Sequence, residues 1–248
     1  MTDEEETLAN GEETFALEID VVSDYMCPWC YLGMLRLGQA LMQLRAEVPE
    51  VGFQVRYWPR VLAPDLEGRE PLVTKREMYM KRFNGSEEAV NKMQEEFEAM
   101  LEPFPEGGYT LDGVAVSTIK AHRLAQWARR ESDEQTQWLL NLELFQAYHM
   151  FGYNLDDDDV LVRAAKRAGF AEERARAFLV SNDLEEEVRA MASDIRPFLP
   201  LSSMYNGGVP HFKVSVGGME LEIPGAQDIE YFVNMFIRMI SKAAQAKL

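Results

Sequence analysis

The chain opens with two short apolar runs that flank a helical pattern. The segment Phe15–Val22 (FALEIDVV) is almost continuously apolar and ends at the turn-like Ser23, which predicts a buried strand. Apolar residues then recur every three or four positions to about Glu47, which predicts a helix. Residues Val51–Trp58 (VGFQVRYW) alternate and are rich in β-forming residues, so they predict a second strand. A strand, a helix and a strand of these lengths form a βαβ unit with parallel strands.

The middle of the chain, from Pro59 to about Tyr205, changes to helical periodicity after a proline-punctuated stretch. Seven helices are predicted there, over Lys75–Phe83, Glu87–Leu101, Val116–Arg130, Glu134–Phe151, Val160–Ala168, Glu172–Val180 and Leu184–Ile195. The aspartate run Asp156–Asp159 is interpreted as a helix cap and a solvated turn. It lacks the alternating ligands and the glycine of a calcium-binding loop.

Strand character returns near the C-terminus. The runs His211–Val216 and Met219–Ile223 flank a Gly-Gly pair and predict an antiparallel hairpin, and a last helix is predicted from about Asp228 to Ala246. The order βαβ, helical block, ββα predicts an α/β protein: a thioredoxin fold with a large all-helical insertion between its two halves. The predicted parts are an acidic disordered tail (1–14), a discontinuous core domain (15–60 and 207–248) and a helical insertion domain (61–206).

Composition and charge exclude several classes of function. Hydrophobic residues make up 47% and charged residues 27% of the 248, as in ordinary globular proteins. A formal net charge of −17 argues against nucleic-acid binding, which needs a basic surface. No apolar stretch approaches the roughly 18 to 20 residues of a membrane span, and the acidic first residues do not resemble a secretory signal. We therefore expect an intracellular, cytoplasmic protein.

The two cysteines are the most informative residues of the composition. They lie three positions apart in Cys27-Pro28-Trp29-Cys30. A disulfide scaffold would carry more cysteines, and a structural zinc site needs four ligands in a chain with only three histidines. The pattern favours a redox pair, with no metal and no resident cofactor.

The predicted position of this motif assigns different chemistry to its cysteines. Cys27 falls at about the N-cap of the first helix and Pro28 at the first helical position, where a proline costs no hydrogen bond. Exposed backbone N–H groups and the helix dipole favour a thiolate at Cys27. Cys30, one turn further in, is expected to be more buried and to stay protonated. Cys27 is therefore the predicted nucleophile and Cys30 the resolving cysteine.

Other residues near the motif leave alternatives open. Asp20 and Asp24 would oppose thiolate formation if they are near the sulfur in space. Trp29 must lie at the mouth of the site, where it contacts either the substrate or its own domain.

The motif and its surroundings resemble the DsbA-like branch of the thioredoxin superfamily, and within it the FrnE-type oxidoreductases. The matching segments are DYMCPWCYLG (24–33), STIKAHRLAQWA (117–128), LFQAYHMFGYNLDDDDVLVRAAKRAGF (144–170), GGVPHFKV (207–214) and IPGAQ (223–227). The resemblance implies thiol–disulfide exchange with protein or small-molecule thiols and disulfides.

The resemblance also implies that Val209-Pro210 is the cis-proline turn that faces the CxxC motif and pairs with an extended substrate. By itself, Pro210 is a proline at the start of a strand and needs no cis bond. His211 is adjacent to this turn and either influences the thiolate or is structural. His122 and His149 lie on predicted insertion helices, where lone histidines are usually structural, and the family's helical block makes them candidate groove-lining residues.

Two departures from the family pattern affect the expected function. The link 197–206 before the cis-proline is longer than the family's short connection, so the groove beside Pro210 is expected to be reshaped. The related kappa-class glutathione transferases and 2-hydroxychromene-2-carboxylate isomerases typically carry serine at the first motif position. Cys27 separates this chain from them, although glutathione remains a possible co-substrate. A glutathione-dependent transferase or isomerase is thus the rival function, and a non-catalytic peptide-binding module with 14 methionines is a third.

The C-terminal tripeptide Ala246-Lys247-Leu248 is similar to the peroxisomal Ser-Lys-Leu address, and an ordinary helix tail is the alternative. A CxxC enzyme in the reducing cytosol is expected to act as a reductase or isomerase.

Overall fold

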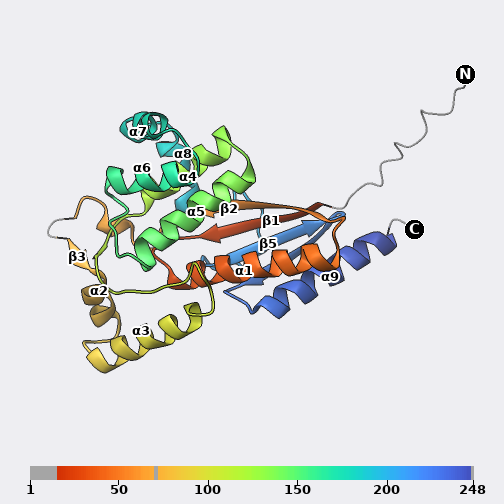
Figure 1. Cartoon of the computed structure of the whole chain (residues 1–248), viewed down its shortest axis with the longest axis horizontal. Helices are drawn as coiled ribbons and strands as arrows, with labels where there is room; N and C mark the ends of the chain where they lie inside the picture. Colours follow the sequence, from red (N-terminus) through yellow and green to blue (C-terminus); the bar gives the residue numbers. More distant parts are fainter. Residues whose placement is uncertain (1–15, 70–71, 247–248) are drawn as a thin grey trace, which may run out of the picture.

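A computed structural model describes residues 16–69 and 72–246 of the chain (Figure 1). A four-stranded sheet in the order β2-β1-β5-β6 forms its centre. The strands are β1 (Ala16–Ser23), β2 (Gly52–Pro59), β5 (His211–Val216) and β6 (Met219–Pro224). Helices α1 (Pro28–Glu47) and α9 (Ile229–Ala246) pack side by side along this sheet. The thioredoxin-like α/β fold predicted from the order of elements is confirmed.

The register of the sheet brings three loops together at one edge. β1 runs parallel to β2, with Ser23 opposite Pro59, and antiparallel to β5, with Val22 opposite His211. The residues that follow β1, follow β2 and precede β5 therefore meet at this edge. β1 is buried over most of its length, as expected for a central strand that is covered on both faces.

Among the described residues between β2 and β5 there are seven α-helices. They are α2 (Lys75–Arg82), α3 (Glu87–Leu101), α4 (Ile119–Glu131), α5 (Glu134–His149), α6 (Asp158–Arg167), α7 (Glu172–Val180) and α8 (Glu185–Ser193). Helices α4, α5 and α8 pack against β2, and α4–α8 are grouped next to that strand in Figure 1. All seven predicted helices are present, with ends that differ from the predictions by up to three residues.

Three short elements of the structure were not predicted, and one of them shifts the start of a predicted helix. The two-residue strands β3 (Val73–Thr74) and β4 (Val114–Ala115) pair with each other, and a 3-10 turn, η1, spans Pro64–Leu66. Periodicity predicted none of the three. The helix predicted from Val116 begins only at Ile119, because the apolar residues just before it belong to β4 and its exit.

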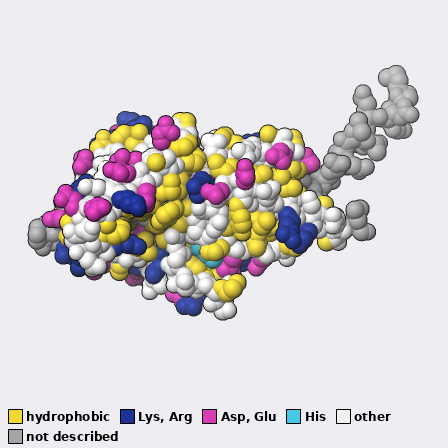
Figure 2. Space-filling model, turned by 90° about the horizontal axis from the view of Figure 1, so that it is seen from below, with side chains coloured by type: hydrophobic (Ala, Val, Ile, Leu, Met, Phe, Trp, Pro, Cys, Tyr) yellow, Lys and Arg dark blue, Asp and Glu magenta, His cyan; other side chains and the backbone are white. Residues whose placement is uncertain are grey.

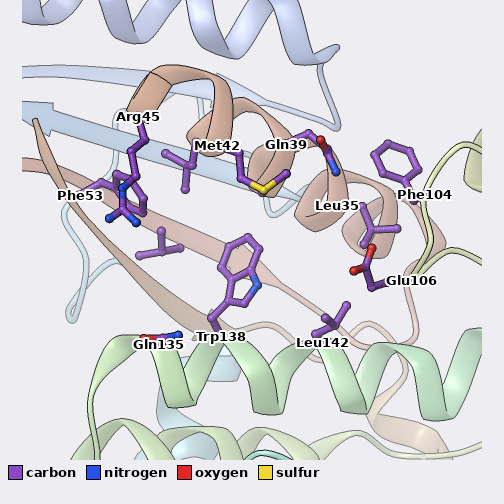
Figure 3. Close-up of a pocket in the computed structure, with 13 residues that line it drawn as sticks. Leu35, Gln39, Met42, Arg45, Phe53, Phe104, Glu106, Gln135, Trp138 and Leu142 are labelled. Atoms are coloured by element: carbon purple, nitrogen blue, oxygen red, sulfur yellow. The ribbon is translucent and has the colours of Figure 1, made fainter. Parts of the chain in front are cut away.

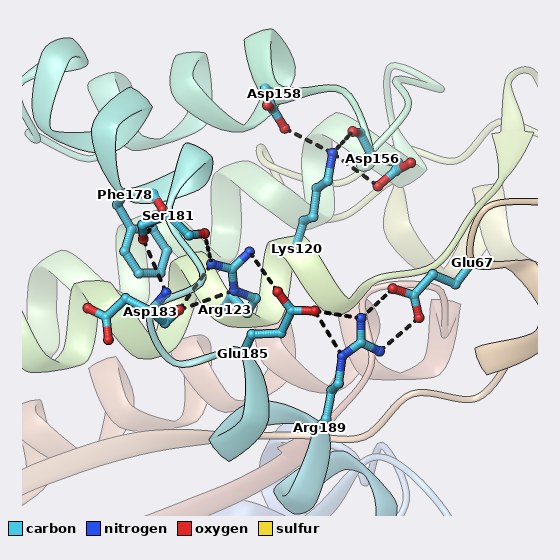
Figure 4. Close-up of polar contacts among 10 residues, drawn as sticks. All are labelled: Glu67, Lys120, Arg123, Asp156, Asp158, Phe178, Ser181, Asp183, Glu185 and Arg189. Atoms are coloured by element: carbon cyan, nitrogen blue, oxygen red, sulfur yellow. Dashed lines mark hydrogen bonds and ion pairs between the residues drawn. The ribbon is translucent and has the colours of Figure 1, made fainter.

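The aspartate run lies at the start of α6, as its interpretation as a cap requires. The Asp157 carboxylate accepts a hydrogen bond from the Asp159 backbone N–H at 2.8 Å. Lys120 of α4 lies 3.4 Å from Asp156 and 3.0 Å from Asp158 (Figure 4). Among the described residues, no group of three or more His, Cys, Asp or Glu side chains is arranged to hold a metal ion.

Two arginines connect the insertion helices in different ways (Figure 4). Arg123 is 4% exposed, and its guanidinium donates to the Ser181 and Asp183 carbonyl oxygens at 2.6 and 3.0 Å. Arg189 pairs with Glu67 and Glu185 at the surface. Arg123 joins α4 to the turn before α8, whereas Arg189 joins α8 to the loop that carries Glu67. Exposed pairs contribute little to stability, so the buried Arg123 is expected to contribute more than Arg189.

The surface mixes apolar and charged side chains. On the face shown in Figure 2, apolar side chains gather in the middle, with charges of both signs around them. No helix in residues 16–69 and 72–246 combines the length and apolarity that crossing a membrane requires. Phe15, the predicted acidic tail and the last two residues of the C-terminal tripeptide lie outside the described residues.

Candidate functional site

Cys27 occupies the N-cap of α1, directly after the turn that leaves β1. Its backbone is extended (φ −84°, ψ 114°), and Pro28 takes the first helical position, so both predictions are confirmed. The Cys27 N–H donates to the Asp24 carbonyl oxygen at 3.0 Å, which closes the turn. Both cysteines are free thiols. Cys27 is 8% exposed and Cys30 is 2% exposed, in the predicted order.

The two thiols have opposite electrostatic surroundings. A hydrogen bond from the Cys30 thiol lowers the pKa of Cys27, and the backbone N–H groups of Cys30 and Trp29 act in the same direction against burial and Asp24. Burial raises the pKa of Cys30 well above the ordinary thiol value, and the neighbouring Cys27 raises it further. Cys27 is therefore the sulfur that ionises first, and Cys30 stays protonated beside it.

The Val209–Pro210 peptide bond is cis and lies against the first cysteine. The Cys27 thiol donates to the Val209 carbonyl oxygen at a sulfur–oxygen distance of 3.8 Å. A side chain at Gly33 of α1 would place its Cβ 3.1 Å from Pro210 Cγ. The missing side chain at this position therefore lets the helix approach the cis-proline turn closely.

Asp24 is a buried junction of three segments. Its Oδ1 accepts hydrogen bonds from the Thr118 hydroxyl at 2.7 Å and the Met26 N–H at 3.2 Å, and its Oδ2 accepts from the Leu62 N–H at 2.7 Å. The carboxylate joins the motif, the loop after β2 and the start of α4, and it raises the pKa of Cys27. Asp20, which the sequence grouped with it, pairs instead with Arg56 at 2.8 Å.

Comparison with known proteins now assigns the family. The sequence profile described as DSBA-like thioredoxin domain matches residues 18–236. The chain belongs to this family. A search of curated protein sequences finds no match.

Solved structures agree with the DSBA-like fold over almost the whole chain. A probable DsbA oxidoreductase from Streptomyces coelicolor is similar with a TM-score of 0.73 and 24% identity, over 91% of this chain and 90% of that one. A 2-hydroxychromene-2-carboxylate isomerase has a TM-score of 0.60 and 14% identity, over 92% and 98%. A cytosolic disulfide reductase, DsbM, from Pseudomonas aeruginosa has a TM-score of 0.54 and 15% identity, over 90% and 98%. Because all three identities are below 25%, the similarity shows a shared fold and not a shared function.

The histidines of this DSBA-like protein lie behind the motif. His149 Nε2 is 2.9 Å from the Tyr25 carbonyl oxygen and stacks on Tyr31 at 5.4 Å, and burial lowers its pKa to about 3, so it is neutral at physiological pH. His122 Nε2 lies 3.1 Å from the Arg60 carbonyl oxygen. Both are buried, so they brace the backbone around the site and do not line an open groove.

His211 is buried at the start of β5 and pairs with a carboxylate. Its Nε2 lies 2.9 Å from Glu222 Oε2. Its ring lies 4.8 Å from that of Tyr205, so the geometry favours a structural role for this histidine.

Trp29 lies between the DSBA-like core and the insertion. Its ring meets the edge of Phe97 of α3 at 4.9 Å, and 45% of the residue is exposed. Phe97 in turn contacts Tyr109 at 5.2 Å. The insertion thus supplies an aromatic wall beside the motif. Its aromatic residues carry no local sequence signal that distinguishes them from other core positions.

A larger apolar cleft lies further along α1, between that helix and α5 (Figure 3). It has a volume of about 500 Å³, and its lining includes Leu35, Met42, Phe53, Trp138 and Leu142. No cysteine or histidine is among its lining residues. It therefore lacks the groups that thiol chemistry requires.

Proposed function

We propose that this DSBA-like protein is a thiol–disulfide oxidoreductase in which Cys27 attacks the substrate and Cys30 resolves the mixed disulfide. The opposite displacement of the two thiol pKa values carries the proposal, because the Cys27 value is lowered and the Cys30 value is raised. The thiolate is the attacking species in thiol–disulfide exchange. Cys27 is therefore the nucleophilic thiolate, and Cys30 stays protonated until the mixed disulfide has formed.

In the proposed reaction, the Cys27 thiolate attacks one sulfur of a substrate disulfide. A Cys27–substrate bond forms as the substrate S–S bond breaks, and the departing thiolate takes a proton from solvent. Cys30 then attacks Cys27 Sγ, which forms the Cys27–Cys30 disulfide and releases the second substrate sulfur, and the proton of Cys30 passes to that sulfur. Two electrons pass to the substrate, and one dithiol or two molecules of a monothiol such as glutathione are oxidised to a disulfide as the pair returns to the reduced form.

The surroundings of Cys27 support an extended or small substrate. The Val209 backbone lies against the thiol, as a partner for a substrate strand would. Trp29 is partly exposed beside it and offers an apolar contact. Fold similarity to proteins described as a probable DsbA oxidoreductase and a cytosolic disulfide reductase supports the same reaction class.

Two serine substitutions test the assignment of roles. Cys27→Ser is expected to lower turnover of a model disulfide with a dithiol donor by about 1000-fold or more, because the nucleophile is removed. Cys30→Ser is expected to retain the first attack and accumulate a mixed disulfide on Cys27, detectable as an added mass under non-reducing conditions. Full turnover by Cys27→Ser would contradict the mechanism.

A glutathione-dependent transferase or isomerase is the second candidate, favoured by the fold similarity to 2-hydroxychromene-2-carboxylate isomerase. Such an activity would use the thiol of bound glutathione and would not need a resolving cysteine. If glutathione conjugation or isomerisation survived Cys30→Ser while disulfide reduction was lost, this second function would be supported.

A further inference from the structure

A small polar pocket lies at the sheet edge where the loop after β2 meets the link before β5. Its volume is about 290 Å³. The residues that line it come from three segments: Arg60, the stretch Ser193–Arg196 at the end of α8, and Tyr205–Gly207 of the long link. This is the link whose length suggested a reshaped groove beside Pro210.

Arg60 brings an uncompensated positive charge to this pocket. Its Nη1 donates to the Ala192 carbonyl oxygen at 2.9 Å, whereas its buried Nε has no hydrogen-bond partner among the described residues. Arg196, the other arginine of the pocket, is held by Asp194 through Nε at 2.8 Å and Nη2 at 3.1 Å, so those two charges cancel. The net charge of the pocket's lining is therefore positive.

Tyr205 adds a second donor without a partner. Its hydroxyl is buried and unpaired among the described residues. Burial raises the pKa of Tyr205, so the hydroxyl keeps its proton, and Arg60 lies close enough to act on this pKa electrostatically. An unpaired buried donor is costly. A small rotation of the Tyr205 hydroxyl toward a bound acceptor would therefore gain a hydrogen bond without breaking one, and Arg60 Nε would gain one if Nη1 kept its bond to Ala192.

Gly207 lies against the Nε–Nη2 edge of Arg60, which carries the unpaired Nε. Its φ is +85°, a conformation that favours glycine, and a Cβ there would lie 3.6 Å from Arg60 Nη2 and 3.9 Å from Nε. A side chain at this position would stand against the Nε–Nη2 edge. That edge is the part of a guanidinium that matches the two oxygens of a carboxylate.

Two of the segments that line the pocket connect it to the residues around the reactive sulfur. Gly207 is two residues before Val209, whose carbonyl oxygen is 3.8 Å from Cys27 Sγ, and two residues span at most about 7 Å. On the other side, the Arg60 N–H donates to the Ser23 carbonyl oxygen at 2.9 Å, next to the turn that carries the motif. The pocket is therefore connected to the same two segments, the turn after β1 and the link before β5, that frame the Cys27 thiol.

We propose that this pocket binds a carboxylate of the disulfide or thiol substrate, with Arg60 and Tyr205 as donors. The protein then prefers substrates that carry an acid group a few bonds from the sulfur. This inference rests on the proposed oxidoreductase function, for which it defines a class of substrate.

A pair of disulfides that differ only in charge tests the pocket in the full-length protein. Turnover of dithiodipropionate, a diacid, is compared with that of its uncharged diamide. Arg60→Gln is expected to lower the ratio of the two kcat/KM values, diacid over diamide, by about 10- to 100-fold, as for a lost charge-assisted hydrogen bond. Arg238→Gln, on the exposed face of α9, is the matched control and should leave the ratio unchanged.

Two further variants keep the test informative if Arg60→Gln folds poorly. Tyr205→Phe removes only the unpaired hydroxyl and should lower the ratio by about 3- to 10-fold, and Arg60→Lys, which keeps the charge without the fork, should give an intermediate value. An unchanged ratio in Tyr205→Phe and Arg60→Lys would overturn the carboxylate site. If the wild-type protein exchanged neither disulfide, the proposed function itself would fail.

Discussion

The two ends of α1 lie in contrasting surroundings. At the N-terminal end, Cys27 and Cys30 are enclosed by the cis-proline turn, backbone N–H groups and the buried Asp24. Further along, Gly38 and Met42 border the cleft between α1 and α5, in which Figure 3 shows Met42 facing Trp138. The larger of the two described pockets thus lies at the end without reactive groups, and the smaller one lies beside the thiols.

The N-terminal end of α1 carries the reactive thiols, whereas the rest of the helix contributes mainly to packing. Thiol–disulfide exchange needs a nucleophilic sulfur as well as space, and of these two regions only the N-terminal end of α1 has one. The cleft beside Trp138 has volume and apolar surface, and polar side chains such as Arg45 and Glu106 line it, but none of its lining residues is a cysteine or a histidine. We therefore expect substitutions at the two ends to affect different properties of the protein.

The largest expected effect of a substitution in the cleft is a loss of stability without a loss of disulfide turnover. Trp138 packs beside Gly38 and contacts Tyr57 at a ring distance of 6.1 Å. Trp138→Ala is expected to lower the free energy of unfolding by about 2 to 3 kcal/mol, less than for a fully buried tryptophan. Denaturant unfolding gives this value, and disulfide turnover should stay at the wild-type level. A large loss of turnover in folded Trp138→Ala would contradict the expectation that the cleft affects stability and not catalysis.

A smaller effect distinguishes two glycines of the same helix. A Cβ at Gly33 would lie 3.1 Å from Pro210 Cγ and 3.3 Å from Phe212 Cζ, whereas one at Gly38 would meet only the Trp138 ring, at 3.0 Å. Overpacking costs about 1 to 3 kcal/mol, and replacing a helical glycine by alanine recovers about 1 kcal/mol.

Gly33→Ala is therefore expected to destabilise by up to about 2 kcal/mol and to slow disulfide exchange by moving Pro210. Gly38→Ala should change stability by less than about 1 kcal/mol, because the Trp138 ring can move into the cleft. Thermal unfolding and turnover of the two variants, measured side by side, check the prediction. Equal losses in both would show that the ends of α1 are not distinct.

The smallest effect concerns the pH dependence of stability at the redox end. The pKa of Cys27 is lower in the folded protein than in the unfolded chain, where it has the ordinary thiol value of about 8.5. Between these two pKa values the unfolded chain binds more protons, so the free energy of unfolding of the reduced protein should rise with pH over this range. Above the ordinary thiol pKa it should fall, because the unfolded chain loses both thiol protons while folded Cys30 keeps its own.

Cys27→Ser provides the control for this pH dependence. It should lose the rise below the ordinary thiol pKa and keep the fall above it. Denaturant unfolding at a series of pH values under reducing conditions measures both limbs. If the free energy of unfolding of Cys27→Ser still rose with pH below the ordinary thiol pKa, the rise would come from groups other than Cys27.

Much of the fold followed from local pattern. The strand before the motif, the helix after it and the C-terminal hairpin were predicted within one or two residues, because helical and strand periods depend on residues only a few positions apart. The short β3–β4 pair was missed because two-residue strands carry no period. Those strands exist only through pairing with a distant segment.

The sequence by itself determined the motif, the N-cap position of Cys27 and the cis-proline turn suggested by family resemblance. The tertiary structure alone decided which distant groups surround them. His149 reaches the Tyr25 carbonyl across 124 positions, Thr118 reaches Asp24 across 94, and Arg60 lies beside Gly207. Such neighbours are set by the register of β1 with β2 and β5, which is a long-range property of the sheet. The local pattern therefore specifies the reacting sulfurs, and the sheet determines what each of them faces.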